Sequence, residues 1–272
     1  KDVTDCAVVL NAIAGHDPLD STSVRKQSEN YLEDMEKGVQ GLKIGIPKEF
    51  FEDGLDPDVK EKIFDAVDQL ETLGVCTAET ALPAIVNAVP AYYLISSAEA
   101  SANLARYDGI RYGYRNPDAK NLSELYRLSR GDGFGREVKR RILLGTYALS
   151  SGYHDELYNK ALKVRRMIAN DFNHAFEQFD VIAAPAYPTT AFKIGEKLED
   201  PLKMYLSDIY TAGVNLAGLP GLVVPCGVGK NGLPVGIQLI GRAFSEKLLI
   251  RVGYAIEKAV GRIGIQRQKE EA

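Results

Sequence analysis

The stretch from residue 205 to residue 242, YLSDIYTAGVNLAGLPGLVVPCGVGKNGLPVGIQLIGR, constrains the fold more than any other part of the sequence. Apolar residues recur in its first half at three- and four-residue steps, which predicts a helix with one buried face. Asp208, Thr211 and Asn215 share the opposite face. The helix is predicted to end at Gly218 and Pro220, because glycine favours a C-terminal cap and proline cannot continue the hydrogen-bond ladder.

Two short apolar runs, residues 222–226 and 235–240, follow this helix. The turn between them contains the pair Asn231-Gly232, which is typical of a β-hairpin. Neither run alternates cleanly between apolar and polar residues, so we expect both strands to be covered on both faces. The hairpin is therefore predicted to hold the most buried part of a sheet.

The N-terminal third of the sequence is predicted to form a helix, a strand, a second helix and a second strand, in that order. The first helix covers residues 3–14, with Thr4 or Asp5 as its cap and an apolar face made of Cys6, Val9, Leu10 and Ile13. Residues 42–47 and 75–77 read as strands, and Asp56 caps the helix between them. A strand, helix and strand of this length predict parallel pairing with a right-handed crossover.

Residues 82–180 are predicted to form a mainly helical insertion between the second and third strands of one domain. Expected helices lie at residues 91–105, 122–128, 136–149 and 154–179, and a buried strand follows at residues 181–185. A helix at residues 245–259 closes the chain. This alternation predicts an α/β fold with helices on both faces of a mixed sheet.

Composition excludes some functions and favours others. The net charge of −4 over 272 residues argues against a nucleic-acid surface of the chain's own, since phosphate binding needs a clustered basic field. Cys6, Cys76 and Cys226 form no CxxC motif, and we expect them to be buried, reduced thiols of a cytoplasmic protein. No apolar run approaches the roughly 20 residues of a membrane span. Because the sequence does not begin with Met, we interpret it as a fragment of a longer protein.

Several common active-site motifs are missing. The three histidines have no metal-ligand spacing, and neither a GxSxG elbow nor a Walker sequence is present. The glycines at 131, 133 and 135 are expected to form a loop that enters a helix. The paired serines Ser96-Ser97 and Ser150-Ser151 are expected on helix surfaces or ends, because no general base lies near them in sequence.

Three positions are candidate ligand contacts. Arg141 follows Glu137 by four residues, so a helical ion pair is favoured on spacing alone, and a guanidinium fork for a carboxylate is the functional interpretation. Asp208 is either a solvated carboxylate or a contact for an amine. Of the adjacent Tyr92 and Tyr93, one is expected in the core and the other could line a pocket.

Four runs resemble the amidase signature family, and more narrowly the A subunits of the glutamyl-tRNA(Gln) amidotransferases. They are SAEASANLARYDG at residues 97–109, FGREVKRRI at 134–142, NLAGLP at 215–220 and PVGIQLIG at 234–241. The resemblance extends from Lys1 to about Ala259 and implies a three-layer α/β/α sandwich around a mixed sheet. It also implies that the nucleophilic serine, second serine and lysine base of the family precede Lys1, so that the chain alone is inactive.

The resemblance implies a glutamine site in this chain. Arg141 would bind the α-carboxylate, Asp208 would bind the α-ammonium, and Tyr92 would line the pocket. The partners implied are the B and C subunits of a heterotrimer that converts Glu-tRNA(Gln) to Gln-tRNA(Gln), with tRNA held mainly by the B subunit. No cofactor is expected in this chain, since ATP and magnesium belong to the B subunit.

Two other functions remain open. One is part of a stand-alone amidase for another small amide, which would not need both Arg141 and Asp208 if its substrate were uncharged. The other is a non-catalytic fragment that only docks partner subunits. An isolated piece of a shared sheet would expose an apolar edge or face in either case.

Overall fold

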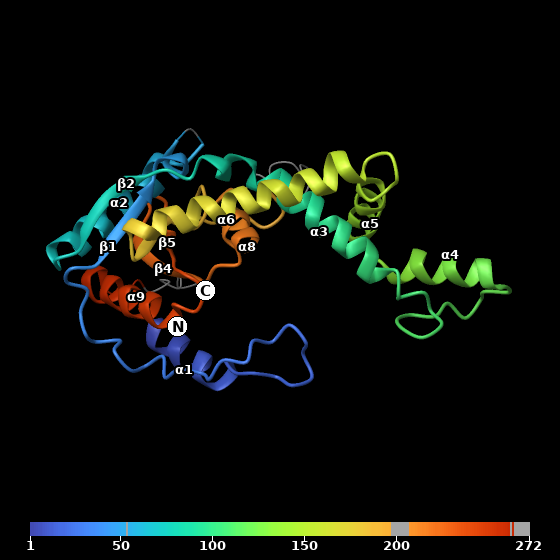
Figure 1. The fold of residues 1–272 in the computed structure, drawn as a ribbon, viewed down its shortest axis with the longest axis horizontal. Coiled ribbons are helices and arrows are strands. Elements are labelled where there is room, and N and C mark those ends of the chain that lie inside the picture. The colour runs from blue at the N-terminus through green and yellow to red at the C-terminus, as the bar shows by residue number, and fades with distance from the viewer. Residues whose placement is uncertain (53, 197–206, 262, 264–272) are drawn as a thin grey trace, which may run out of the picture. The chain divides into compact units, whose positions relative to one another are not determined.

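The computed structural model describes residues 1–52, 54–196, 207–261 and 263. Within it, residues group into a sheet unit, formed by residues 1–86 and 168–272, and a helical unit, formed by residues 87–167. Figure 1 shows the elements of each unit along the chain.

The sheet unit is built on five strands in the order β2-β1-β3-β5-β4. Strand β1 (Lys43–Pro47) pairs in parallel with β2 (Cys76–Thr80) and with β3 (Val181–Pro185). Strand β5 (Pro234–Ile240) is antiparallel to both β3 and β4 (Gly221–Val228). The predicted mixed sheet and α/β fold are therefore confirmed.

Helix α2 (Pro57–Thr72) connects β1 and β2, as predicted, after a short 3₁₀ turn, η1 (Lys48–Phe51). Asp56 is its N-cap and accepts a hydrogen bond from the backbone N–H of Asp58. Val59, Ile63 and Leu70 are almost completely buried and form an apolar stripe along the helix. Because α2 contacts β3, β4 and β5, this stripe packs on the sheet.

Helices α9 (Glu246–Val260) and α8 (Ile209–Ala217) pack against opposite faces of the β4–β5 hairpin. Leu222 and Val224 contact Gly253 of helix α9, while the side chain of Gln238 donates to the backbone carbonyl of Tyr210 in helix α8. Val223, the pairing partner of Gln238, lies between Leu222 and Val224 in β4 and therefore points to the α8 face. Helices, sheet and helices make three layers, as the resemblance implied.

The expectation that both hairpin strands are fully covered is right for β5 and wrong for β4. Strand β5 is buried along most of its length, because β3 and β4 flank it. Strand β4 alternates between exposed and less exposed residues and lies at the edge of the described sheet, with Val223 52% exposed. Apolar sequence alone did not distinguish an edge strand from a central one.

The helical unit contains α3 (Ala88–Leu104), α4 (Leu122–Gly133), α5 (Arg136–Ala148), a π-helical turn η3 (His154–Asn159) and the first part of α6 (Lys160–Gln178). The 3₁₀ turn η2 (Pro83–Asn87) precedes α3. Each predicted helix of this region is confirmed. The glycine-rich loop is shorter than expected, because α4 continues through Gly131 and Gly133 and only Phe134 and Gly135 separate it from α5.

Helix α1 (Val3–Ile13) differs from its prediction in two ways. Asp2, not Thr4 or Asp5, is the N-cap, and it accepts from the backbone N–H of Asp5 at 2.8 Å. Val3 and Ala7 are its buried residues, whereas Val9 and Ile13 of the predicted apolar face are 55% and 74% exposed. The residues around 30–37 form turns.

The cysteine prediction is correct for one residue of three. All three thiols are free, and Cys226 is buried, but Cys6 and Cys76 are exposed. Cys6 is exposed because its face of α1 is uncovered, and Cys76 because β2 is the other edge of the sheet. Among the described residues, no helix is long and apolar enough to cross a membrane.

Candidate functional site

Arg141 lies in the middle of α5 and is held by two neighbours of the helical unit. Its Nε donates to Oε1 of Glu137 at 3.1 Å, so the predicted ion pair across one helical turn is confirmed. Its guanidinium carbon lies 5.5 Å from the centre of the Tyr93 ring, a distance at which a cation is attracted to the ring face. The side chain remains 33% exposed.

The surroundings of Arg141 keep it cationic. Partial burial acts to lower the pKa of the guanidinium, but the hydrogen bond to Glu137 and the nearby Tyr93 and Tyr92 outweigh it, and the pKa is raised. Glu137 also pairs with Arg140, so one carboxylate faces two guanidinium groups and the cluster keeps a net positive charge. Within the described part of the chain, the hydrogen bond recorded for Arg141 uses Nε, which leaves the two terminal nitrogens for a carboxylate.

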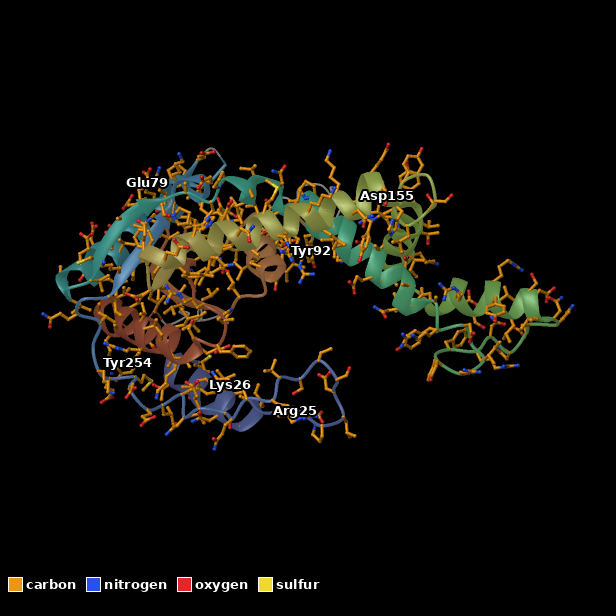
Figure 2. All side chains as sticks on the ribbon, in the orientation of Figure 1. Arg25, Lys26, Glu79, Tyr92, Asp155 and Tyr254 are labelled. Atoms are coloured by element: carbon orange, nitrogen blue, oxygen red, sulfur yellow. The ribbon has the colours of Figure 1, made fainter. Side chains whose placement is uncertain are left out.

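Two tyrosines of α3 form the aromatic side of this cluster. Tyr92 and Tyr93 are both half-buried, and their ring centres lie 5.1 Å apart in an edge-to-face arrangement with an interplanar angle of 80°. Figure 2 labels Tyr92 on the ribbon of α3. The structure thus brings Arg141 and the tyrosine pair together, with Tyr93 in direct contact. That Tyr92 is the residue lining a ligand pocket stays a prediction.

Helices α3 and α5 approach closely because Gly145 has no side chain. A Cβ placed on Gly145 would lie 1.9 Å from the carbonyl oxygen of Ser97. The expectation that Ser96 and Ser97 lie on a helix surface is wrong, since both hydroxyl oxygens are buried and without a hydrogen-bond partner among the described residues. The signal that sequence reasoning missed is the small residue Gly145, whose lack of a side chain lets α5 approach the backbone of Ser97.

Asp208 lies at the N-terminus of α8 in the sheet unit. Its backbone carbonyl accepts the first hydrogen bond of the helix, from Ala212 N at 2.9 Å, and its side chain makes no capping hydrogen bond. The side chain is half-buried, on the same side of α8 as Thr211 and the exposed Asn215, as predicted. Tyr205 and Leu206, predicted to begin this helix, lie outside the described residues.

The candidate residues are divided between the two units. Arg141 and Tyr92 belong to the helical unit and Asp208 to the sheet unit. That the three contact one bound glutamine therefore stays a prediction. Each type of side chain suits its predicted role, because a planar guanidinium matches a carboxylate and an aspartate matches an ammonium group.

The sheet unit also has an apolar groove of about 550 Å³ between α1 and β4. Its walls are made by the exposed face of α1 and by the edge strand, with contributions from Val9, Ile13, Leu222, Val223 and Pro225. This groove is mainly apolar, and Lys1, Asp2, Asp5 and Glu257 are also among its lining residues. Within the described ranges, no three His, Cys, Asp or Glu side chains gather in a way that could hold a metal ion.

Comparison with known proteins supports the predicted family. The family model described as Amidase matches residues 1–250. The A subunit of the glutamyl-tRNA(Gln) amidotransferase from Caldanaerobacter subterraneus is 57% identical over 259 residues, which are 95% of this chain and 53% of that protein. The corresponding protein from Brevibacillus brevis is 56% identical over 264 residues, 97% of this chain and 54% of that protein. The chain thus spans about half the length of the curated relatives that it matches.

Solved structures agree. The crystal structure of the glutamyl-tRNA(Gln) amidotransferase A subunit from Thermotoga maritima has a TM-score of 0.75 and 40% identity, over 95% of this chain and 51% of that one. A bacterial aryl acylamidase of the amidase signature family shares the fold, with a TM-score of 0.72 at 20% identity over 95% of this chain and 51% of that one. Sequence, family model and fold agree, and the chain belongs to the amidase family, the amidase signature enzymes.

Proposed function

We propose that this chain is the part of a tRNA-dependent amidotransferase's glutaminase subunit that binds the amino-acid end of glutamine. The observation that carries the proposal is the 57% identity, over 95% of the chain, to the A subunit of a glutamyl-tRNA(Gln) amidotransferase. The chemistry of the cluster around Arg141 supports it. A bound amino acid carries two opposite charges, and each must meet an opposite charge when it leaves water.

Arg141 binds the α-carboxylate in this proposal. Its Nε donates a hydrogen bond to Glu137, and its guanidinium lies over the ring of Tyr93. These two contacts orient the guanidinium before the ligand arrives. The two terminal nitrogens then form parallel hydrogen bonds to the carboxylate. Asp208 binds the α-ammonium, and Tyr92 lines the pocket. Holding the charged head orients the side-chain amide for attack, which is the positional part of catalysis.

The remaining parts of the reaction are assigned to other segments. We place the serine nucleophile and the lysine base in the half of the relatives that this sequence does not span. The B and C subunits complete a cytoplasmic heterotrimer that converts Glu-tRNA(Gln) to Gln-tRNA(Gln), and ATP and magnesium act on the B subunit. No cofactor is needed for the glutamine-binding role of this chain.

The test is Arg141→Ala in an enzyme of the relatives' full length, with glutamine hydrolysis measured without tRNA. Losing a charge-assisted pair costs about 1.5–3 kcal/mol, so kcat/KM for glutamine should fall roughly tenfold to a hundredfold. Arg140→Ala is the matched control, because Arg140 is the adjacent residue of α5 and pairs with the same Glu137. Equal kcat/KM values for the two variants would refute the assignment of Arg141.

A stand-alone amidase for an uncharged amide is the competing function. The fold likeness to the aryl acylamidase, at 20% identity, concerns the fold and leaves the substrate open. Profiling the full-length enzyme with glutamine and with uncharged amides separates the two. Faster turnover of an uncharged amide, unaffected by Arg141→Ala, would favour the competing function.

A further inference from the structure

The net charge of the chain hides a strong asymmetry between its two units. The helical unit carries 14 Lys and Arg residues against eight Asp and Glu, a formal net charge of +6, although the whole chain has −4. Residues 106–140 hold nine of those basic residues and five acidic ones. We call residues 106–140 the basic segment. The argument from net charge against a nucleic-acid surface therefore does not apply to this unit.

The basic segment has a defined structure. Its loop folds back on α4 (Figure 1), since the backbone N–H of Asn116 donates to Ser129 at 3.0 Å and its side chain donates to Asp132 at 2.8 Å. Arg130 donates to the backbone carbonyls of Leu104 and Tyr107 at 2.8 and 3.1 Å. These contacts hold the loop in place, and other arginines are left on its surface.

The acidic and basic side chains of the basic segment differ in their contacts. Glu124 and Asp108 accept hydrogen bonds from nearby backbone N–H groups, and Asp132 accepts from Asn116. Arg106, Arg111 and Arg127 are exposed, and no ion pair is recorded for any of them in the part of the chain that the structure describes. The acidic groups thus stabilise the loop, while the exposed guanidinium groups face solvent.

Exposed tyrosines lie next to these arginines in the sequence. Tyr107, Tyr112, Tyr114 and Tyr126 are between 39% and 57% exposed. Tyrosine rings stack on unpaired bases, and arginine binds phosphate through a planar fork and also stacks. Seven of the nine basic residues are arginine. Arginine together with exposed aromatic rings fits a nucleic acid with accessible bases better than it fits an acidic protein surface.

We infer that the basic segment is an RNA-binding surface that contacts phosphates through Arg106, Arg111 and Arg127 and bases through the exposed tyrosines. The arginines and the exposed rings are the observations that point to RNA as the class of ligand. That the RNA is the tRNA substrate rests on the proposed function. The inference gives this chain its own contact with RNA, in addition to any contact made by a partner protein.

The experiment measures binding of two fluorescent RNAs to the 272-residue chain by anisotropy over a series of salt concentrations. The probes are a tRNA(Gln) transcript and an unstructured oligouridine. Arg106→Ala/Arg111→Ala/Arg127→Ala should weaken binding of both at least tenfold and reduce the slope of log K against log salt by about two, because each phosphate contact adds roughly 0.7–0.9 to that slope. The matched control is Lys160→Ala/Lys163→Ala/Arg166→Ala, which removes the same charge from exposed positions of α6 in the same unit and should weaken binding less than threefold.

Two further variants separate the contribution of charge from that of base stacking. Replacing the same three arginines with lysine keeps the charge and should restore most of the salt dependence but only part of the affinity. Tyr112→Leu should weaken oligouridine binding severalfold with an unchanged salt slope. Equal effects of the two triple-alanine variants, or no RNA binding at low salt, would overturn the inference. If Arg106→Ala/Arg111→Ala/Arg127→Ala lost binding to an acidic partner protein but kept its RNA binding, the inference would also be overturned. The surface would then be assigned to protein docking.

The RNA experiment is independent of glutamine chemistry. If both RNAs bind through the basic segment but Arg141→Ala leaves glutamine hydrolysis unchanged, the RNA surface stands and the proposed function fails. If only oligouridine binds, the surface stands and its assignment to tRNA fails.

Discussion

Arg141 shows how far a single residue can be interpreted from sequence. Its spacing from Glu137 predicts the ion pair that the structure contains, at 3.1 Å. The contact with Tyr93 was not predictable, because Tyr93 is 48 positions away in sequence and reaches Arg141 only through the packing of α3 on α5. A pairwise pattern along one helix is local, whereas an aromatic contact across two helices depends on the fold.

Gly145 sets that packing, and its substitution tests it. In Gly145→Ala, the new Cβ would collide with the backbone of Ser97, so α5 must move away from α3. The expected loss in free energy of unfolding is roughly 1–3 kcal/mol, measured by urea denaturation. Gly131→Ala in α4 is the control, since a Cβ there meets nothing within 4 Å, and it should be neutral or stabilising by up to about 1 kcal/mol. Equal stability of the two variants would show that α3 and α5 do not depend on this close contact.

Cys226 gives a prediction for pH. Burial raises the pKa of this thiol from 9.0 to about 12, so the folded chain keeps it protonated where the unfolded chain ionises it. The contribution of this thiol to the free energy of unfolding is fully present below pH 9. It is lost as the pH rises towards about 12, at up to about 1.4 kcal/mol per pH unit. The free energy of unfolding of Cys226→Ala should fall less steeply over this range than that of the parent chain. Identical slopes for the two proteins would contradict the assignment.

At the scale of elements, local signals predicted most helices and strands. Asp56 before Pro57 located α2, and the turn at Asn231-Gly232 located the hairpin. The errors concern which face of an element is covered. Apolar residues of α1 and β4 were expected in the core, but their neighbours in the described structure leave them exposed. Periodicity identifies an apolar face, and only tertiary contacts show whether anything covers it.

The exposed face of α1 predicts association of the isolated chain. Ile13 is 74% exposed beside β4, the edge strand of the described sheet, and exposed apolar surface at a sheet edge favours self-association. Ile13→Lys should shift the chain towards monomer in sedimentation velocity. Val8→Lys is the control, because Val8 is similarly exposed at 51% but does not line the groove. If both substitutions change the sedimentation profile equally, the groove is not the site of association.

At the scale of the whole molecule, the sequence predicted the α/β fold and the family correctly. The whole-chain net charge of −4 conceals a net charge of +6 on the helical unit, so it describes neither unit by itself. The role of Arg141, Tyr92 and Asp208 as one glutamine site came from family resemblance. Spacing could not supply it, because Asp208 is separated from Arg141 by 67 positions and belongs to the other unit.

The central claim is that Arg141 and Asp208 hold the two charges of one glutamine. The most direct measurement compares kcat/KM for glutamine, glutaramic acid and 4-aminobutanamide in the full-length parent, Arg141→Ala and Asp208→Asn enzymes, with thermal unfolding of each enzyme checking its fold. Arg141→Ala should lose its preference for glutamine over 4-aminobutanamide, which lacks the α-carboxylate. Asp208→Asn should lose its preference over glutaramic acid, which lacks the α-amino group. Equal losses by both variants on all three substrates would contradict the claim.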